Sequence, residues 1–288
     1  MRRLALALLL WAAAISSGAP AAQSALPGRP DSLKFAAMGD TGTGNRAQYD
    51  VGQQLVSARA RFPFELVIML GDNMYGRQQR QDFIVKFERP YAALLSAGVG
   101  FYAALGNHDN PANTQYEGFH MGGARYYTFA RKNTRFFVLD SNQMDPRQLA
   151  WLDDALKQSK DDWKICYFHH PLYSDGGRHG PDVQLRVALE PLLVKYGVNV
   201  VLAGHDHIYE RFLPQKGITY FVSGAGGELA KGDTRPSAAS AAHFDQDQSF
   251  LLVEVAGDDL FFQAVSRTGV IVDSGVIRRQ STSTTGAL

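Results

Sequence analysis

Five short apolar runs of this chain each end in residues that commonly bind metal ions, and this pattern constrains the fold more than any other feature. Four of the runs are followed by glycine and then by Asp, Asn or His, in Gly39-Asp40, Gly71-Asp72, Gly106-Asn107-His108-Asp109 and Gly204-His205-Asp206-His207. The fifth run is followed by His169-His170-Pro171, so that five of the eight histidines lie at run ends. In open α/β sheets the carboxyl ends of the strands line the ligand crevice, and glycine there permits a tight turn. The sequence therefore predicts that these polar side chains converge at one edge of a sheet.

The apolar runs alternate with amphipathic segments over most of the chain. The expected strands are Phe35–Met38, Leu66–Leu70, Gly100–Leu105, Phe136–Leu139, Lys164–Phe168 and Val198–Ala203. The expected helices are Arg46–Arg59, Gln79–Leu95, Pro146–Lys157 and Asp182–Tyr196. Short apolar strands that alternate with amphipathic helices are typical of an α/β protein whose strands are buried on both faces.

The helical pattern stops in the last third of the chain. Apolar runs at Thr219–Ser223, Phe250–Val255, Leu260–Val265 and Val270–Ile277 predict consecutive antiparallel strands. A second sheet layer, mixed or antiparallel, is therefore expected. Between these runs, Gly224–Gln248 is rich in Gly, Ala and Ser and lacks periodicity, which predicts a long functional or mobile loop.

The two ends of the chain differ from its middle. Arg2 and Arg3 precede the apolar run Leu4–Ile15 and the small residues Ala19-Pro20-Ala21, which is the pattern of a secretory signal. The run is shorter than the roughly 20 residues that span a bilayer. We therefore expect a signal at 1–21 and an exported chain, periplasmic or extracellular, with no stable membrane anchor after cleavage. We further expect a linker at 22–33, a single domain at 34–280 and a disordered tail at 281–288.

Charge and cysteine content exclude several kinds of partner and site. The chain has 29 Lys and Arg against 28 Asp and Glu, so no basic excess favours nucleic acid. A single cysteine, Cys166, excludes an internal disulfide and a cysteine-rich metal site, and we expect it in the core. Neither a G-x-x-x-x-G-K-[ST] loop nor a G-x-S-x-G turn is present, which disfavours a P-loop nucleotidase and an α/β-hydrolase.

The candidate ligands are oxygen and nitrogen donors without thiolate. This mixture suits iron, zinc or manganese. Carboxylates can bridge two ions, and two adjacent ions form a clamp for phosphoryl transfer from an ester. The sequence therefore predicts a metal-dependent reaction at phosphorus.

The order of the motifs resembles that of the calcineurin-like metallophosphoesterases. The motifs are G-D-x-G (Gly39–Gly42), G-D-x-x-Y (Gly71–Tyr75), G-N-H-D (Gly106–Asp109), H-x-P (His169–Pro171) and G-H-x-H (Gly204–His207). Tyr75 narrows the resemblance to purple acid phosphatases, and the short chain resembles the small, tartrate-resistant type. The resemblance covers roughly 34–277, and it implies a four-layer α/β/β/α sandwich of two mixed sheets.

The resemblance also implies a pair of metal ions and their ligands. Fe(III) is expected on Asp40, Asp72, Tyr75 and His207, and a divalent iron, zinc or manganese ion on Asp72, Asn107, His169 and His205. Asp72 then bridges the two ions. His170 competes with His169 for the second ion, and we favour His169 because the family's histidine stands two residues before the proline.

The implied function is that of an exported acid phosphatase acting on small phosphate monoesters through a metal-bridging hydroxide. The resemblance gives His108 the role of general acid, with Asp109 fixing its tautomer, and gives His179 a contact with substrate. A phosphodiesterase or nucleotide pyrophosphohydrolase on the same fold is an alternative, as is a non-catalytic metal- or phosphate-binding protein. His120 and His243 match no motif and are expected on the surface or in loops.

Overall fold

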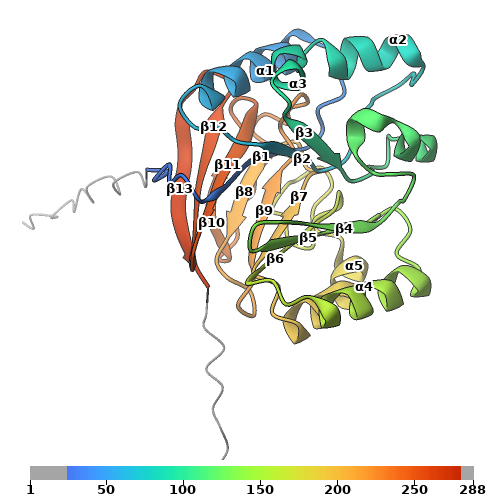
Figure 1. Ribbon diagram of the computed structural model, residues 1–288, viewed down its shortest axis with the longest axis vertical. Helices are drawn as coiled ribbons and strands as arrows, with labels where there is room; N and C mark the ends of the chain where they lie inside the picture. Colours follow the sequence, from blue (N-terminus) through green and yellow to red (C-terminus); the bar gives the residue numbers. More distant parts are fainter. Residues whose placement is uncertain (1–24, 280–288) are drawn as a thin grey trace, which may run out of the picture.

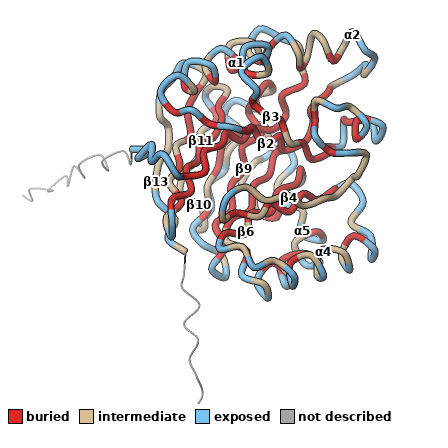
Figure 2. The backbone as a smooth tube through the Cα atoms, in the orientation of Figure 1, coloured by how far each residue is buried: buried red, intermediate tan, exposed pale blue. Residues whose placement is uncertain are grey.

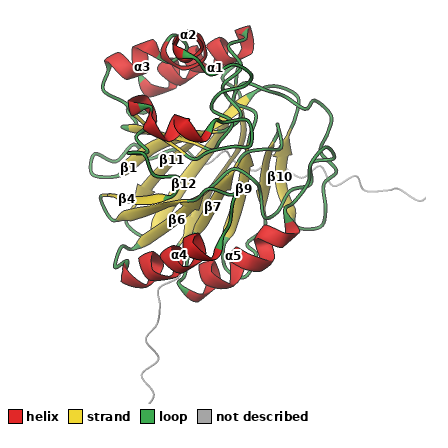
Figure 3. Cartoon of the chain, turned by 90° about the vertical axis from the view of Figure 1, so that its right-hand side faces the viewer, coloured by secondary structure: helices red, strands yellow, loops and turns green. Residues whose placement is uncertain are grey.

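The computed structural model describes residues 25–279, which form two stacked β-sheets between two groups of helices (Figure 1). One sheet has six strands in the order β13-β12-β11-β1-β2-β3, and the other has seven in the order β10-β8-β9-β7-β6-β5-β4. Helices α1, α2 and α3 lie outside the first sheet, and α4 and α5 outside the second (Figure 3). The α/β/β/α sandwich of two mixed sheets that the sequence predicts is confirmed. The predicted signal at 1–21 and tail at 281–288 lie outside the described residues.

The six-stranded sheet combines a parallel and an antiparallel half. Its strands are β1 (Leu33–Met38), β2 (Leu66–Met69), β3 (Gly100–Ala103), β11 (Ser249–Ala256), β12 (Asp259–Ser266) and β13 (Ile271–Arg278). Strands β1, β2 and β3 pair in parallel, and β11 pairs antiparallel with both β1 and β12. The carboxyl ends of β1, β2 and β3 therefore meet at one edge of the sandwich.

The seven-stranded sheet has a parallel centre and antiparallel edges. Its strands are β4 (Tyr127–Arg131), β5 (Thr134–Val138), β6 (Trp163–Tyr167), β7 (Val200–Ala203), β8 (Tyr209–Phe212), β9 (Thr219–Ser223) and β10 (Ser240–Phe244). Strands β5, β6, β7 and β9 run parallel, whereas β4, β8 and β10 run antiparallel to their neighbours. This parallel centre presents a second set of carboxyl ends.

The three longest helices within the described residues, α1, α4 and α5, each begin at a capping side chain. The helices are α1 (Arg46–Arg59), α2 (Arg80–Phe83), α3 (Ala92–Ser96), α4 (Pro146–Gln158) and α5 (Val183–Lys195), with a π-turn η1 (Ile84–Glu88) and 3₁₀ turns η2 (Pro111–Gln115) and η3 (Glu117–Phe119). Asn45, Asp145 and Asp182 each accept a hydrogen bond of 2.8–2.9 Å from a main-chain N–H in the first turn of α1, α4 and α5. Such caps contribute about 1 kcal/mol each. No helix within residues 25–279 combines the length and the apolar character that crossing a bilayer requires.

Three apolar clusters fill the spaces between the four layers. Ala36 and Met38 of β1 face α1 and α3, whereas Phe35 and Ala37 face the other sheet, as the two-residue period of a strand requires. A third cluster lies between the seven-stranded sheet and helices α4 and α5, and it contains Cys166. The central strands are accordingly buried, whereas the edge strands β4, β10 and β13 are only partly buried and the outer faces of the helices are exposed (Figure 2). The expectation that Cys166 belongs to the core is confirmed.

The helix predicted over Gln79–Leu95 is interrupted in the structure. Helix α2 passes into the π-turn η1, in which the Arg89 N–H bonds to the Ile84 carbonyl, and α3 starts only at Ala92. Pro90 lies at the break, where it has no N–H to donate to a continuing helix. The sequence pattern is therefore right about helical structure here but wrong about one continuous helix.

Two predictions for the last third of the chain are corrected. Strand β9 pairs in parallel with β7 of the seven-stranded sheet, so it does not form an antiparallel series with β11, β12 and β13. The segment Gly224–Gln248 is not wholly a loop, because β10 pairs with β8 at the edge of that sheet. This Ala- and Ser-rich strand is held by main-chain hydrogen bonds, and its sequence therefore shows no alternation of apolar and polar residues.

The described part of the predicted linker is bonded to the domain. The buried Glu254 carboxylate of β11 accepts hydrogen bonds from the main-chain N–H groups of Gly28 (2.7 Å) and Arg29 (2.6 Å) and from the Ser32 hydroxyl (2.6 Å). These contacts lead the chain directly into β1.

Candidate metal centre

The loops after β1, β2, β3, β6 and β7 meet at one edge of the sandwich, as the strand-end pattern predicts. The Asp40 N–H bonds to the Gly71 carbonyl (3.0 Å), which ties the β1 loop to the β2 loop. In the other sheet, the Gly204 N–H bonds to the His169 carbonyl (3.0 Å). The two sheets are joined at this edge because the His205 N–H bonds to Asp40 Oδ2 (2.9 Å).

Three of the predicted ligands have a left-handed backbone conformation, which residues other than glycine rarely adopt. The φ angles of Asp40, Asp72 and His205 are 56°, 50° and 71°. Such left-handed residues cost on the order of 1–3 kcal/mol each and cluster at functional sites, although His120, Lys132 and Lys216 adopt the same conformation elsewhere. The backbone is therefore strained at three of the residues that the sequence predicts as ligands.

Two of the motif glycines allow the loops to approach each other. A Cβ atom on Gly106 would lie 2.1 Å from Asp72 Oδ1, and one on Gly204 would lie 2.6 Å from Asp40 Oδ2. Any side chain at these positions would displace the carboxylate that it touches. The glycines are thus required by close packing around both carboxylates.

One half of the donor set surrounds His169. Its Nε2 atom lies 3.0 Å from Asn107 Oδ1, 3.1 Å from His205 Nδ1 and 3.5 Å from Asp72 Oδ2. Its Nδ1 atom lies 3.0 Å from the Leu70 carbonyl oxygen, to which it donates its hydrogen. A main-chain acceptor on one ring nitrogen orients the other toward a metal ion.

The other half of the donor set surrounds Tyr75. Its hydroxyl lies 3.2 Å from Asp40 Oδ1 and 3.3 Å from His207 Nε2, and those two atoms are 3.5 Å apart. Tyr75 follows Asp72 by three residues, and the loop turns back so that the phenol reaches the end of β1. The seven predicted ligands therefore form two adjoining groups.

The electrostatic field of this edge favours positive charge. His169 is fully buried, and burial alone would lower its pKa, but the Asp40 and Asp72 carboxylates raise the pKa to about 9. Burial would likewise lower the pKa of His207, but the Asp40 carboxylate outweighs burial and raises it. Burial, together with the charges of Asp40 and Asp72, raises the pKa of Tyr75 above its usual range.

The residues present fit a pair of metal ions. Carboxylate, amide, phenol and imidazole donors converge with neighbouring donor atoms 3.0–3.5 Å apart, and Asp40, Asp72 and His169 among them are buried. The two carboxylates raise the pKa of His169 and so favour a proton on its ring. A metal ion would displace that proton. Asp40, Asp72 and His169 also lie within 4.8 Å of one another through their donor atoms.

A sequence model of the calcineurin-like phosphoesterase family matches residues 33–209, which is more than half of the chain. This chain belongs to the calcineurin-like phosphoesterase family. The family uses a dinuclear metal centre. The match spans β1 to the start of β8 and so contains all seven predicted ligands.

Relatives with known activities or structures resemble this phosphoesterase over most of its length. Tartrate-resistant acid phosphatase type 5 of Oryctolagus cuniculus is 29% identical over 250 residues, which cover 72% of this chain and 75% of that protein. A purple acid phosphatase from yellow lupin has a TM-score of 0.72 at 20% identity, covering 89% of this chain and 55% of the lupin chain. A Plasmodium protein, GAP50, described as the anchor in the inner membrane complex, has a TM-score of 0.76 at 17% identity, covering 88% of this chain and 90% of that chain. The last two similarities establish the fold alone.

The structure distinguishes the two histidines that compete for the second ion. One nitrogen of each of His169, His170 and His205 lies within 4.8 Å of the others, so proximity alone does not separate them. His169 faces Asn107 and Asp72, whereas His170 Nδ1 lies 2.8 Å from the Ser141 hydroxyl. The assignment of the ligand to His169 stays a prediction.

The expected partnership of His108 with Asp109 is corrected by the structure. The Asp109 carboxylate accepts main-chain hydrogen bonds from Gly106 (2.8 Å), Asn73 (3.1 Å) and Met74 (3.0 Å). The tight turn after β3 points consecutive side chains in opposite directions, so Asp109 is buried while 52% of the His108 side chain is exposed. Asp109 holds the loop together and does not orient the His108 ring.

The two remaining candidate residues lie over the donor set. The His108 ring packs against Tyr75 with ring centroids 4.7 Å apart, and its Nε2 atom lies 3.9 Å from Asp72 Oδ2. The exposed His179 ring lies 4.3 Å from the His205 ring, between centroids. Both side chains therefore border the metal centre on its open side.

His120 and His243 lie away from the centre. Both are exposed, as predicted; His120 bonds to the Phe101 carbonyl (2.9 Å), and His243 lies on β10. Neither approaches the donor set through any contact within residues 25–279.

Sequence reasoning missed several residues that shape this site. Ser141 contacts His170, and Gln78 bonds to main-chain atoms of both His108 (2.5 Å) and Asn110 (2.7 Å). A signal for Ser141 was present, because Asp140-Ser141-Asn142 follows the end of β5 in the same way as the other motifs. The role of the Leu70 carbonyl has no such signal, because every residue has a main-chain carbonyl.

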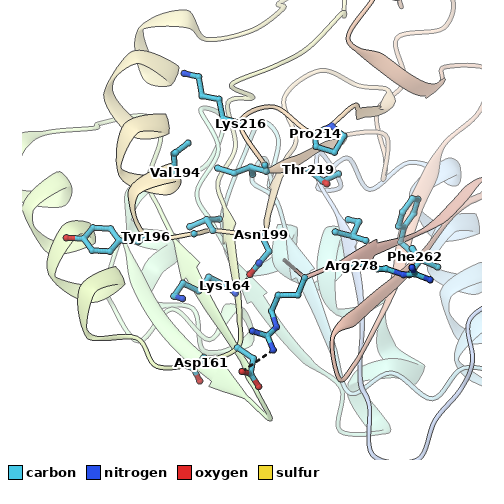
Figure 4. Close-up of a pocket in the computed structure, with 18 of the residues that line it drawn as sticks. Asp161, Lys164, Val194, Tyr196, Asn199, Pro214, Lys216, Thr219, Phe262 and Arg278 are labelled. Carbon is cyan, nitrogen blue, oxygen red and sulfur yellow. Dashed lines mark hydrogen bonds and ion pairs between the residues drawn. The ribbon is translucent and has the colours of Figure 1, made fainter. Parts of the chain in front are cut away.

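Two hollows of different character lie at opposite edges of the sheets. A cavity of about 740 Å³ adjoins the metal centre and is lined by Asn107, Ser141 and His170 among others. A cleft of about 760 Å³ lies at the amino ends of β6, β7 and β9, around Lys164, Asn199 and Thr219 (Figure 4). The second hollow faces away from the donor set, so only the first is close enough to hold part of a reacting molecule.

Proposed function

We propose that this phosphoesterase is an acid phosphatase that hydrolyses phosphate monoesters at a centre of Fe(III) and a divalent iron, zinc or manganese ion. The observation that carries the proposal is the convergence of seven donors at one edge of the sandwich: Asp40, Asp72, Tyr75, Asn107, His169, His205 and His207. The similarity to tartrate-resistant acid phosphatases supports the substrate class.

The contacts support one assignment of the donors to the two ions. Asp40, Tyr75 and His207 would hold Fe(III), and Asn107, His169 and His205 would hold the divalent ion. Asp72 adjoins both groups, because its carboxylate lies 3.5 Å from His169 Nε2 and its charge also acts on Tyr75. It would therefore be shared.

The phenol of Tyr75 supports the ferric assignment. A phenol must lose its proton to bind a metal ion, and a trivalent ion displaces that proton better than a divalent one. With Tyr75 ionised, Asp40, Asp72 and Tyr75 carry three negative charges against five on the ion pair. The positive excess favours an anionic phosphate ester.

The reaction divides between the ions and the residues around them. When bound, the two ions supply Lewis acidity toward the phosphate ester and the nucleophile for its hydrolysis. His108 borders the open side of the centre and donates a proton to the oxygen of the leaving alcohol, a role worth about 10²–10⁴-fold in rate. His179, whose ring lies 4.3 Å from the His205 ring between centroids, would contact the phosphate group.

Hydrolysis of p-nitrophenyl phosphate and of bis-p-nitrophenyl phosphate by the purified metal-loaded protein tests this function. We expect the monoester to be preferred, with an optimum on the acid side of neutrality. Preference for the diester would instead identify a phosphodiesterase. Phosphate binding without turnover would identify a non-catalytic protein.

We also infer export of the phosphoesterase to the periplasm or the medium. The pattern at 1–21 supports this inference. Determination of the amino-terminal residue of the secreted protein tests it, with cleavage expected after Ala21.

A further inference from the structure

His170 is a half-buried histidine beside the metal centre to which the proposed function gives no role. Two contacts tie it to Ser141, a buried residue in the loop after β5. The His170 main-chain N–H donates a hydrogen bond to Ser141 Oγ (3.0 Å), and the same oxygen lies 2.8 Å from His170 Nδ1. The serine therefore contacts both the backbone and the ring of one residue.

These two contacts favour a hydrogen on the Nε2 atom of the His170 ring. Ser141 Oγ already accepts one hydrogen bond, and its own hydrogen needs an acceptor because the hydroxyl is buried. His170 Nδ1 is the acceptor available to it among the described residues. The hydroxyl thus donates to Nδ1, and the neutral ring carries its hydrogen on Nε2, which is then a donor.

The His170 ring is also part of the wall of the cavity beside the metal centre. This cavity of about 740 Å³ shares Asn107 with the donor set, so a phosphate ester bound at the centre can extend its alcohol part into it. The ring centroids of His170 and His205 are 4.4 Å apart, which puts His170 at the boundary between the two spaces.

The charges around the cavity restrict what the alcohol part can be. Arg125 lies in the wall, but its guanidinium is engaged by Asp140 (2.6 Å) and by Gln143 Oε1 (2.7 Å). Asp182 and the buried Asp109 add further carboxyl groups to the lining. A second anionic group on the substrate would meet more carboxyl groups than free cations, whereas a neutral hydroxyl can bond to the polar wall.

We propose that His170 is a substrate-binding residue of this phosphoesterase: Ser141 holds its ring with the hydrogen on Nε2, and that hydrogen bonds to a hydroxyl of the substrate's alcohol part in the adjoining cavity. The preferred substrates are accordingly monoesters of neutral, hydroxylated alcohols. This inference rests on the proposed function. Ser141 acts through His170 as a positioning residue.

Variants at His170 compared on two substrates test the proposal. For His170→Phe, kcat/KM with glycerol 2-phosphate is expected to fall about tenfold, mainly through KM, which is the size of one hydrogen bond. With p-nitrophenyl phosphate, which lacks a hydroxyl, it is expected to change less than about twofold. His170→Gln, which places an amide N–H near the position of Nε2, is expected to recover part of the loss. His243→Phe makes the same change on exposed β10 and serves as the control.

Two further measurements distinguish failure of this inference from failure of the proposed function. Metal content should be unchanged in His170→Phe; loss of a metal ion would make His170 a ligand and overturn the proposal. Nitrogen NMR of the histidine rings should find the Nε2–H form of His170 in the wild type and a mixture in Ser141→Ala, and an Nδ1–H form in the wild type would overturn it too. Wild-type turnover with equal losses on both substrates contradicts this inference alone. No wild-type turnover of either ester contradicts the proposed function as well.

Discussion

The main-chain N–H of His205 donates a hydrogen bond of 2.9 Å to Oδ2 of Asp40, and this bond joins the two sheets at the metal centre. Asp40 follows β1 of the six-stranded sheet and His205 follows β7 of the seven-stranded sheet. Both residues have left-handed backbone conformations, so the connection carries strain. Ions bound between these loops would hold together the edge at which the strain lies.

Metal removal should therefore destabilise the protein. Ions that bind only the folded chain stabilise it by about 2.7 kcal/mol at a free concentration 100 times the dissociation constant. We expect a clear fall in the melting temperature after chelation, with recovery when iron and zinc are restored. An unchanged melting temperature after verified metal loss would contradict a structural contribution of the centre.

The stability of the metal-free protein should depend on pH through His169. Its pKa is about 9 in the fold and 6.5 in a free histidine, because Asp40 and Asp72 outweigh burial. A raised pKa stabilises the fold while the group is protonated, so this contribution is complete below about pH 6.5 and is lost as the pH rises through about 9. Urea unfolding of the metal-free protein across this range should reveal the decline, and His169→Gln should reduce it. A free energy of unfolding that does not change with pH over this range would contradict the raised pKa of His169.

Much of the candidate site was predictable because strand ends leave a local signal. A buried strand followed by glycine and a polar residue marks both the end of the strand and the position of a ligand, so Asp40, Asp72, Asn107 and His205 could be found from the sequence. His169 has no preceding glycine, but it ends an apolar run in the same way. Parallel pairing then brings the ends together. The family resemblance added the division of these ligands between two ions.

Other features depend on contacts between distant segments. Pro90 in the sequence indicates the break in the helix, but no periodic pattern of residues predicts the π-turn before it. Strand β10 forms through main-chain pairing with β8, for which side-chain pattern gives no signal. The position of the Asp109 carboxylate depends on the N–H groups of Asn73 and Met74, which a distant loop supplies.

The two neighbouring histidines should respond differently to truncation. His169→Ala removes a donor that faces Asn107 and Asp72, so we expect loss of the divalent ion and of most activity. His170→Ala should keep both ions and lose much less activity toward p-nitrophenyl phosphate. Elemental analysis of both variants checks the contrast, with His205→Ala as a second ligand variant. The reverse order of metal loss would show that the ligand was assigned to the wrong histidine.

Tyr75→Phe should remove a visible absorption band. A phenolate bound to Fe(III) produces charge-transfer absorption in the purple acid phosphatases that this chain resembles, and the phenolic hydroxyl is the only group that the substitution deletes. The ring packs against His108 and would remain in place, so a folded protein is expected. The comparison is the visible spectrum of the two proteins at equal iron content. A band of unchanged position and intensity would exclude Tyr75 as the ferric ligand.

The effect of His108→Ala should depend on the leaving group. An alkyl ester needs a proton on its departing oxygen, whereas p-nitrophenolate leaves without one. We expect kcat to fall by about 10²-fold or more for an alkyl ester and far less for p-nitrophenyl phosphate. His120→Ala, an exposed histidine elsewhere on the surface, is the control. Equal losses for both esters would remove His108 from the role of general acid.

The most direct test of the proposed centre is elemental analysis of the native protein, read together with its phosphatase activity. The account predicts about two metal ions per chain, one of them iron, as expected for a two-metal phosphoesterase site. Activity toward p-nitrophenyl phosphate should fall in proportion as the ions are removed and return when they are restored. Full activity in a preparation with fewer than about one ion per chain, or with zinc or manganese and no iron, would contradict the ferric dinuclear centre.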